Sequence, residues 1–217
     1  MTEMKFIAIK AVGDWVVDIT AVPFNDVDSD KQHFDDETDI MEGSFPNPPI
    51  FYHHGVEPGA KELQSRPEVI GKSLSVTKKP DGWHIIAILD KASKYAQRVW
   101  EAVKKGMVAV SSDSIAHLAR LEVGGKVMHY EKSRAGRIAV WPLAGVSLWD
   151  RTKENFEPAS RQAVALPAMK AIYRDAGIVF PELDTTGAKE NAEALKKRTE
   201  IIEQSKRIIQ RSKKWTS

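Results

Sequence analysis

The chain has 217 residues, of which 42% are hydrophobic and 29% are charged, a composition typical of a folded protein and not of a disordered one. Its 32 basic and 30 acidic side chains leave a formal net charge of +2, so the overall charge gives no reason to expect binding to nucleic acid or to a membrane. The chain contains no cysteine, which excludes disulfides, thiolate metal ligands and a cysteine nucleophile, and favours a reducing compartment such as the cytoplasm.

The first 90 residues have the pattern of strands joined by turns. Residues 4–22 are rich in Ile, Val and Trp around a Gly-Asp pair and predict a strand, a turn and a strand. Residues 26–42 hold eight acidic side chains and one lysine, which predicts a loop or a solvated edge. The sequence PPIFYHH, residues 48–54, predicts a strand that ends in a turn, and Pro80-Asp81-Gly82 predicts the turn of a hairpin.

One amphipathic helix interrupts these strands. Residues 91–105 change to a helical hydrophobic period, and Gly106 stands where a C-terminal cap belongs. Residues 107–123 and 126–150 then form the arms of a predicted long hairpin around Gly124-Gly125, with an irregular second arm. The sequence therefore predicts an α+β domain over residues 1–160.

The remaining residues, 161–217, have a different composition, rich in Ala, Lys, Glu and Arg, and predict a helical C-terminal extension. Leu195, Ile202 and Ile209 recur every seven residues, as in a coiled coil. Such a stripe either packs on its own domain or contacts a scaffold or a second copy, and we expect a homo-oligomer.

Two groups of residues have a partial resemblance to metal sites. Residues 26–37 place acidic side chains at the first, third, fifth and twelfth positions of an EF-hand loop, but Lys31 replaces the glycine that makes its sharp turn. His53 and His54 are adjacent, so on a strand they would point to opposite faces, and no third ligand stands at a recognisable spacing. We expect a solvated acidic loop, no metal and no cofactor.

A serine pair and a histidine form the strongest chemical pattern. The segment KKGMVAVSSDS, residues 104–114, carries Ser111 and Ser112 out of a helix and along a short apolar strand. A serine becomes a nucleophile when a base takes its proton, and histidine is the side chain suited to this at pH 7. His54 precedes the pair, and strand alternation lets only one of the two serines face it.

The order of several segments resembles a known family. VPFNDVDSD, DDETDI, PPIFYHHG, VIGKS, the stretch from DGWHIIAILD to VAVSSDSIAHL, and GRIAVWPLAGVSLWD together span about residues 10–160. They resemble the prohead (capsid maturation) proteases of tailed bacteriophages, which share a fold with assemblin, the herpesvirus maturation protease. The resemblance implies an antiparallel, partly closed β-barrel with a few surrounding helices, followed by the C-terminal helical extension.

The resemblance also implies a function. Members of this family are serine endopeptidases that cleave the scaffold and the major capsid protein inside the procapsid, in the host cytoplasm, and usually cleave themselves. No cofactor is required. The base should be His54, and the nucleophile Ser111 or Ser112. The Ser-x-Gly form of the motif favours Ser111, and the distance from the helix-ending glycine favours Ser112, which is our choice.

The third member of a catalytic triad is where this chain departs from the family. Many relatives carry a glutamate at the position that is Gly145 here, and the glycine of their Ser-Ser-Gly motif is Asp113. Asp113 could supply the missing carboxylate, although alternation turns it away from the face of Ser112. A Ser-His dyad, or a carboxylate from the acidic loop, remains open.

The register of the predicted hairpin gives the distances of other polar residues from the two serines. A turn at Gly124-Gly125 pairs His129 and Glu131 with residues 118–120, about 20 Å from the serines. His117 is about as far away. The same register places Arg137 opposite Ser112. Because the herpesvirus relatives use an arginine near the oxyanion, the resemblance makes Arg137 a candidate for that role, and a surface arginine is the alternative.

Two other functions remain open. A catalytically inactive assembly or scaffolding protein could keep the protease fold, and Gly145 and Asp113 favour this alternative. A metal-dependent hydrolase built on His53 and His54 would instead be sensitive to chelators.

Overall fold

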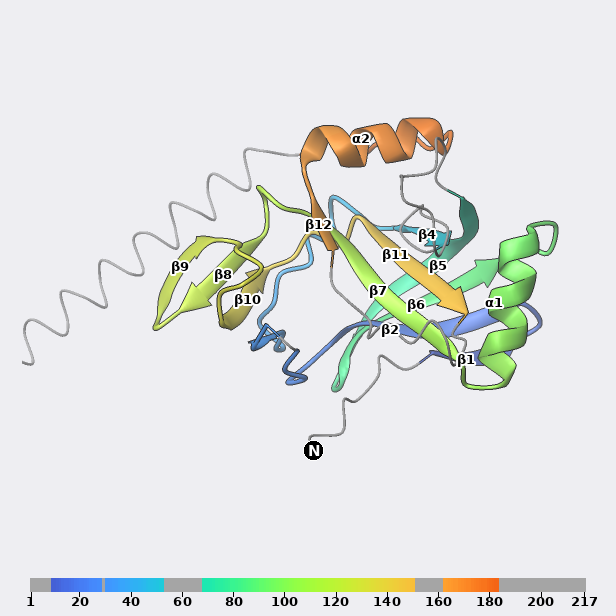
Figure 1. Ribbon diagram of the computed structural model, residues 1–217, viewed down its shortest axis with the longest axis horizontal. Coiled ribbons are helices and arrows are strands. Elements are labelled where there is room, and N and C mark those ends of the chain that lie inside the picture. Colours follow the sequence, from blue (N-terminus) through green and yellow to red (C-terminus); the bar gives the residue numbers. More distant parts are fainter. Residues whose placement is uncertain (1–8, 29, 53–67, 151–161, 184–217) are drawn as a thin grey trace, which may run out of the picture. The chain divides into compact units, whose positions relative to one another are not determined.

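The computed structural model describes residues 9–28, 30–52, 68–150 and 162–183. These residues form strands in two sheets and two helices, an α+β fold (Figure 1). In chain order the elements are β1 (Ile9–Gly13), β2 (Val16–Pro23), β3 (Gln32–His33), β4 (Pro49–Tyr52), β5 (Val69–Lys79), β6 (Gly82–Leu89), α1 (Lys94–Lys104), β7 (Val108–Ile115), β8 (Arg120–Val123), β9 (Lys126–His129), β10 (Gly136–Val140), β11 (Gly145–Asp150), β12 (Gln162–Val164) and α2 (Leu166–Asp175).

The larger sheet has eight strands in the order β1-β2-β6-β5-β4-β11-β7-β12. Its pairs are antiparallel except β4–β11 and β7–β12, which are parallel. The expected partly closed barrel is wrong: among the described strands the sheet stays open, because β1 and β12 each have a neighbour on one side only. A barrel closes by pairing its first and last strands, and the three residues of β12 offer little edge for that.

The smaller sheet, in the order β3-β10-β8-β9, corrects the predicted long hairpin. Gly124 and Gly125 do form its turn, with φ of +57° and +76°, and Arg120 pairs with His129 as the register predicts. However, the first arm breaks after Ile115, where the N–H groups of Leu118 and Ala119 both bond to the Ile115 carbonyl. β7 therefore stays in the large sheet while β8 turns into the small one.

The two helices pack on opposite faces of the large sheet, because they contact adjacent residues of β4. α1 begins at its N-cap Ser93, whose side chain accepts from the N–H of Ala96, and its Tyr95 stacks on Tyr52 of β4. α2 buries Met169 and Tyr173, and Tyr173 packs edge-on against Phe51, the β4 residue that points to the other face. Strands in the middle of the sheet are thus covered from both sides, and all eight residues of β7 are buried.

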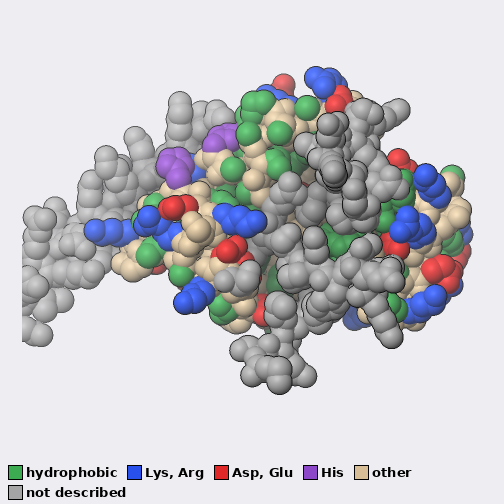
Figure 2. All heavy atoms as spheres, in the orientation of Figure 1, with side chains coloured by type: hydrophobic (Ala, Val, Ile, Leu, Met, Phe, Trp, Pro, Cys, Tyr) green, Lys and Arg blue, Asp and Glu red, His purple; other side chains and the backbone are tan. Residues whose placement is uncertain are grey.

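The described start of the C-terminal extension belongs to the sheet domain. β12 pairs with β7, and a compact unit formed by the chain's own contacts runs to Pro181, past the predicted boundary at residue 160. The helix predicted over residues 188–214 lies outside the described residues. Neither described helix is long and apolar enough to cross a membrane. On the face drawn in Figure 2, acidic and basic side chains are interspersed, in keeping with the small net charge.

A charged network is built into strands β2, β5 and β6. Asp18, which is 5% exposed, accepts from Lys79 Nζ at 2.9 Å and lies 2.8 Å from Nδ1 of His84. The other ring nitrogen of His84 lies 3.0 Å from Oδ1 of Asp81. Burial alone would raise the pKa of Asp18, but the hydrogen bonds and positive charges of Lys79 and His84 outweigh it and hold that pKa below its usual value.

Asp18→Asn should therefore lower the free energy of unfolding at pH 7 by about 1–3 kcal/mol, because Lys79 and His84 lose a charged acceptor. A lowered folded-state pKa stabilises the fold above the unfolded-state pKa, and this stabilisation is lost as the pH falls through the folded-state value. The gap between variant and wild type should accordingly shrink below about pH 4. Urea unfolding at pH 7 and pH 3 measures this difference in unfolding free energy between the variant and the wild type.

The matched control is Asp14→Asn, because Asp14 pairs with Lys91 on the surface, with a side chain 77% exposed. Surface pairs of this kind contribute little, so this variant should unfold like the wild type. An Asp18→Asn deficit of equal size at both pH values would contradict the assigned role of the carboxylate.

Candidate active site

Strand alternation separates the two candidate serines. Ser111 and Asp113 point to the α2 face of β7, and Ser112 points to the α1 face. Across the strand pair, Ser111 stands opposite Ser147 of β11, and Asp113 stands opposite Gly145. The register therefore gathers Ser111, Asp113 and Ser147 on one face of the sheet.

Ser112 has a structural partner in the core. Its Oγ accepts a hydrogen bond of 3.0 Å from Nε1 of Trp141, a fully buried side chain whose ring packs against Phe34 and Tyr130. A buried indole N–H without an acceptor would cost about 1–3 kcal/mol, so this bond alone accounts for a polar residue at position 112. Our choice of Ser112 as nucleophile stays a prediction, and this geometry does not favour it.

Ser111 is fully buried, and its Oγ has no hydrogen-bond partner in the part of the chain that the structure describes. The hydroxyl of Ser114 is also without a partner there, so this property alone does not distinguish Ser111. What distinguishes it is its surroundings: an aspartate two residues along the strand and a serine directly across on β11. A buried polar group left unbonded is costly and requires an explanation, of which a catalytic role is one.

Asp113 is held by a residue that the sequence interpretation missed. Ser147 Oγ donates to Oδ2 of Asp113 at 2.6 Å, and both side chains are buried. The signal was present, since Ser147 is a single hydroxyl within the apolar strand GVSLW. Its pairing with Ser111 could not be seen without the register of β7 against β11.

Tyr173 of α2 closes this face of the sheet. Its hydroxyl donates to the backbone carbonyl of Ala144, and its ring contacts Phe51. Burial raises the pKa of Tyr173, and the negative charge of Asp113 raises it further, so the phenol stays protonated and remains a donor. The helix thus contributes to the burial of the Ser111 face.

The predicted base, His54, lies outside the described residues, as does His53. The strand that leads to them, β4, ends at Tyr52. Phe51 pairs with Ser147, which pairs with Ser111, so β4 runs two strands away from Ser111, about 10 Å at the usual strand spacing. The structure therefore brings the strand preceding the histidines close to Ser111 in space.

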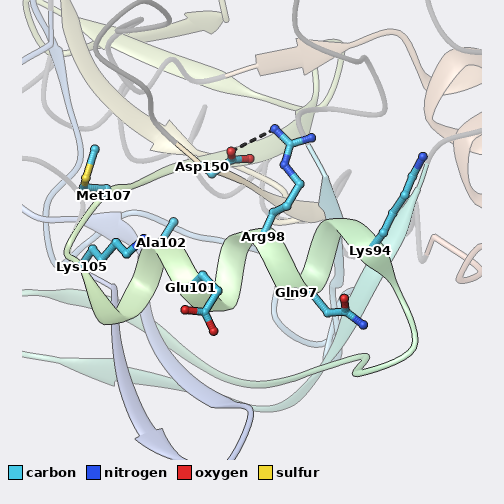
Figure 3. A pocket seen from close by; sticks show the side chains of 8 residues that line it. All are labelled: Lys94, Gln97, Arg98, Glu101, Ala102, Lys105, Met107 and Asp150. Atoms are coloured by element: carbon cyan, nitrogen blue, oxygen red, sulfur yellow. Dashed lines mark hydrogen bonds and ion pairs between the residues drawn. The ribbon is translucent and has the colours of Figure 1, made fainter.

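The end of β4 is fixed by a network on the α1 face. Tyr52 donates to Oδ1 of Asp150 at 2.8 Å, and Arg98 of α1 donates to Oδ2 of Asp150 at 3.0 Å, the contact drawn in Figure 3. The N–H of Tyr52 also bonds to the carbonyl of Glu68 at 2.9 Å, where the described chain resumes. Burial, and then the carboxylate of Asp150, raise the pKa of Tyr52, which keeps its hydroxyl protonated.

Figure 3 also shows an open hollow along α1. Its lining residues are Lys94, Gln97, Arg98, Glu101, Ala102, Lys105, Met107 and Asp150. Arg98, which lines this hollow, forms an ion pair with Asp150. We assign no chemistry to this hollow.

Arg137 does not lie opposite Ser112, so the register argument for it is wrong. It belongs to β10 in the small sheet, where it pairs with Glu122, and Ser112 pairs with Val146 in the large sheet. Its guanidinium forms ion pairs with Glu122 and, at 3.1 Å, with Asp35. The broken hairpin explains the error, and Arg137 has the surroundings of a structural ion pair.

No family model matches the chain, and no curated protein or solved structure matches it.

Since the chain has no cysteine, Ser111→Cys and Ser112→Cys each introduce a single thiol that reports access to its face. Both should react slowly with a thiol reagent, because both positions are fully buried. Adding Tyr173→Ala should speed labelling several-fold at position 111 and leave position 112 unchanged, since α2 covers only the first face. Reaction rates with an aromatic disulfide reagent measure this.

Thermal melting of each variant controls for general loosening of the fold, which would raise both rates together. Equal acceleration at positions 111 and 112 would show that α2 does not cover one face selectively.

Proposed function

We propose that the chain is a serine endopeptidase related to the prohead proteases, which cleaves scaffold and capsid proteins during procapsid maturation in the host cytoplasm. The observation that carries the proposal is the buried, unbonded hydroxyl of Ser111, beside Asp113 and two strands from β4. The strand β4 leads directly into His53-His54 in the sequence. The family resemblance over about residues 10–160 supports the same assignment.

Ser111 is the better nucleophile of the pair. Its hydroxyl is uncommitted among the described residues, whereas the Oγ of Ser112 accepts from Trp141 on the core side. Ser111 also fits the Ser-x-Gly form of the family motif, with Asp113 at the glycine position. These contacts support Ser111 over Ser112, the residue that the sequence favoured.

The reaction is acyl transfer. Ser111 Oγ attacks the carbonyl carbon of the scissile peptide while His54 takes the hydroxyl proton. When the C–N bond breaks, His54 gives that proton to the leaving amine, and an ester on Ser111 remains. A water molecule that loses its proton to His54 then hydrolyses the ester and frees the serine. Backbone N–H groups near the serine stabilise the oxyanion, each contributing about 3 kcal/mol.

The second candidate is an inactive assembly protein that keeps this fold. The full burial of Ser111 favours it, because a substrate carbonyl needs access to the hydroxyl. In this case the chain would act through contacts with capsid and scaffold proteins or with further copies of itself, without cleaving them. The two functions differ in whether Ser111 is required.

Ser111→Ala should abolish cleavage of the cognate capsid protein and of the chain itself, by at least about 10³-fold, because the nucleophile is lost. Intact-mass spectrometry of the full chain, incubated alone and with the capsid protein, measures the products. Reaction with a fluorophosphonate probe should modify the wild type at Ser111.

Ser112→Ala and Ser114→Ala are the matched controls on the same strand. Ser112→Ala should lower stability by about 1–3 kcal/mol, since the Trp141 N–H loses its acceptor, yet cleavage should continue. Uncut substrate with the wild-type chain, or unchanged cleavage with Ser111→Ala, would refute the peptidase and favour the assembly protein.

A further inference from the structure

The small sheet ends in an open edge at β9. Among the described residues this strand has β8 as its only neighbour, and Figure 1 shows it at the end of the sheet. The residues on either side of a two-residue turn form a hydrogen-bonded pair, here Val123 and Lys126, and such pairs alternate along a hairpin. The backbone N–H and C=O groups of Val127 and His129 therefore point away from β8. Within the described ranges no other backbone group bonds to them.

One face of this hairpin packs on the core, and the other face is polar. Leu121 is fully buried, and Met128 opposite it packs against the same hydrophobic core. Arg120 and its cross-strand partner His129 lie on the other face. A strand added to β9 would therefore place every second side chain on the face of Arg120 and His129.

Arg120 has a guanidinium that no carboxylate neutralises in the part of the chain that the structure describes. Its Nη1 donates to the carbonyls of His117 and Ala119, at 2.7 and 2.9 Å, which fixes the group and leaves Nε and Nη2 without a described partner. Burial lowers the pKa of Arg120, and no neighbouring charge offsets that effect. An arginine stays protonated even so, so a positioned positive charge remains, with N–H groups to donate.

Arg137, on the same face of the sheet, differs from Arg120 in having acidic partners. It stands opposite Glu122, two residues from Arg120 on β8, and forms ion pairs with Glu122 and Asp35. Burial acts on Arg137 as well, but its hydrogen bonds to these two carboxylates outweigh it and raise its pKa. Glu122 is thus engaged by Arg137, and Arg120 requires an anion that the described residues do not supply.

An extended polypeptide with acidic side chains matches both features. Its backbone would continue the sheet along Val127 and His129, and its carboxylates would lie on the face of Arg120, whose N–H groups form strong hydrogen bonds with a carboxylate. A second copy of the chain matches less well, because pairing two β9 strands would bring a second Arg120 to the same face. Nucleic acid would match the charge but not the strand edge.

We infer that β9 and Arg120 together form a docking edge for an extended acidic peptide segment, which adds a strand to the small sheet and places a carboxylate on Arg120. The docking edge is independent of the proposed peptidase activity, since neither Ser111 nor β7 takes part in it.

The test is the fluorescence anisotropy of a labelled peptide in which threonine and glutamate alternate, titrated with the full chain. The wild type should bind it, and a peptide with glutamine in place of each glutamate should bind at least about tenfold more weakly, because hydrogen bonds to charged groups are the stronger ones. Arg120→Gln should weaken binding of the glutamate peptide about 10–100-fold for the same reason.

Arg174→Gln is the matched control, because Arg174 is an exposed arginine of α2 that pairs with Asp175. This variant should bind the glutamate peptide like the wild type.

Val127→Pro tests the strand edge itself, and it decides the matter if Arg120→Gln does not fold. Proline removes the outward N–H and leaves the hydrogen bonds between β8 and β9 in place, which is why edge strands tolerate it. Binding of the glutamate peptide should be lost, while circular dichroism shows that the fold is retained.

The inference is overturned if the wild type does not bind the glutamate peptide, or binds the glutamine peptide equally well. Unchanged binding in whichever of Arg120→Gln and Val127→Pro folds would overturn it too. Sedimentation of the chain alone tests the other occupant: a dimer that Val127→Pro converts to a monomer would assign the edge to a second copy and contradict the inference.

Discussion

The fold and the candidate site both depend on the burial of β7 from two sides. A strand covered on both faces has no solvent side on which to place polar groups, so each hydroxyl or carboxylate on it requires a partner or a purpose. Ser112 has its partner in Trp141, and Asp113 has one in Ser147. Ser111 and Ser114 have none among the described residues, and Ser111 differs from Ser114 in lying beside Asp113 and opposite Ser147.

The sequence predicted local structure well wherever a turn or cap has a chemical signature. Gly106 follows the end of α1, Pro80-Asp81-Gly82 joins β5 to β6, and the two glycines at 124 and 125 turn β8 into β9. These features depend on residues close together in the chain, so local patterns identify them. Pairings between distant strands are different, because hydrophobic alternation does not say which strand is the neighbour.

The closed barrel, the continuous long hairpin and the position of Arg137 were wrong at that level. Residues 107–123 look like one continuous strand, yet the chain turns after Ile115 and enters a second sheet. The sequence identified Ser111, Ser112 and Asp113 as candidates but could not identify Ser147, whose importance comes from facing Ser111 across β11. His54 lies outside the described residues, so its role stays a prediction.

The network of Tyr52, Asp150 and Arg98 connects the surface of α1 to the ends of β4 and β11. Tyr52 and Asp150 terminate two adjacent parallel strands, and one surface arginine on α1 reaches the carboxylate that joins them. A substitution on the solvent side of a helix therefore acts on two strand termini together, leaving the tightly packed interior of the sheet untouched. Arg98 thus links the ends of β4 and β11 from an accessible position on α1.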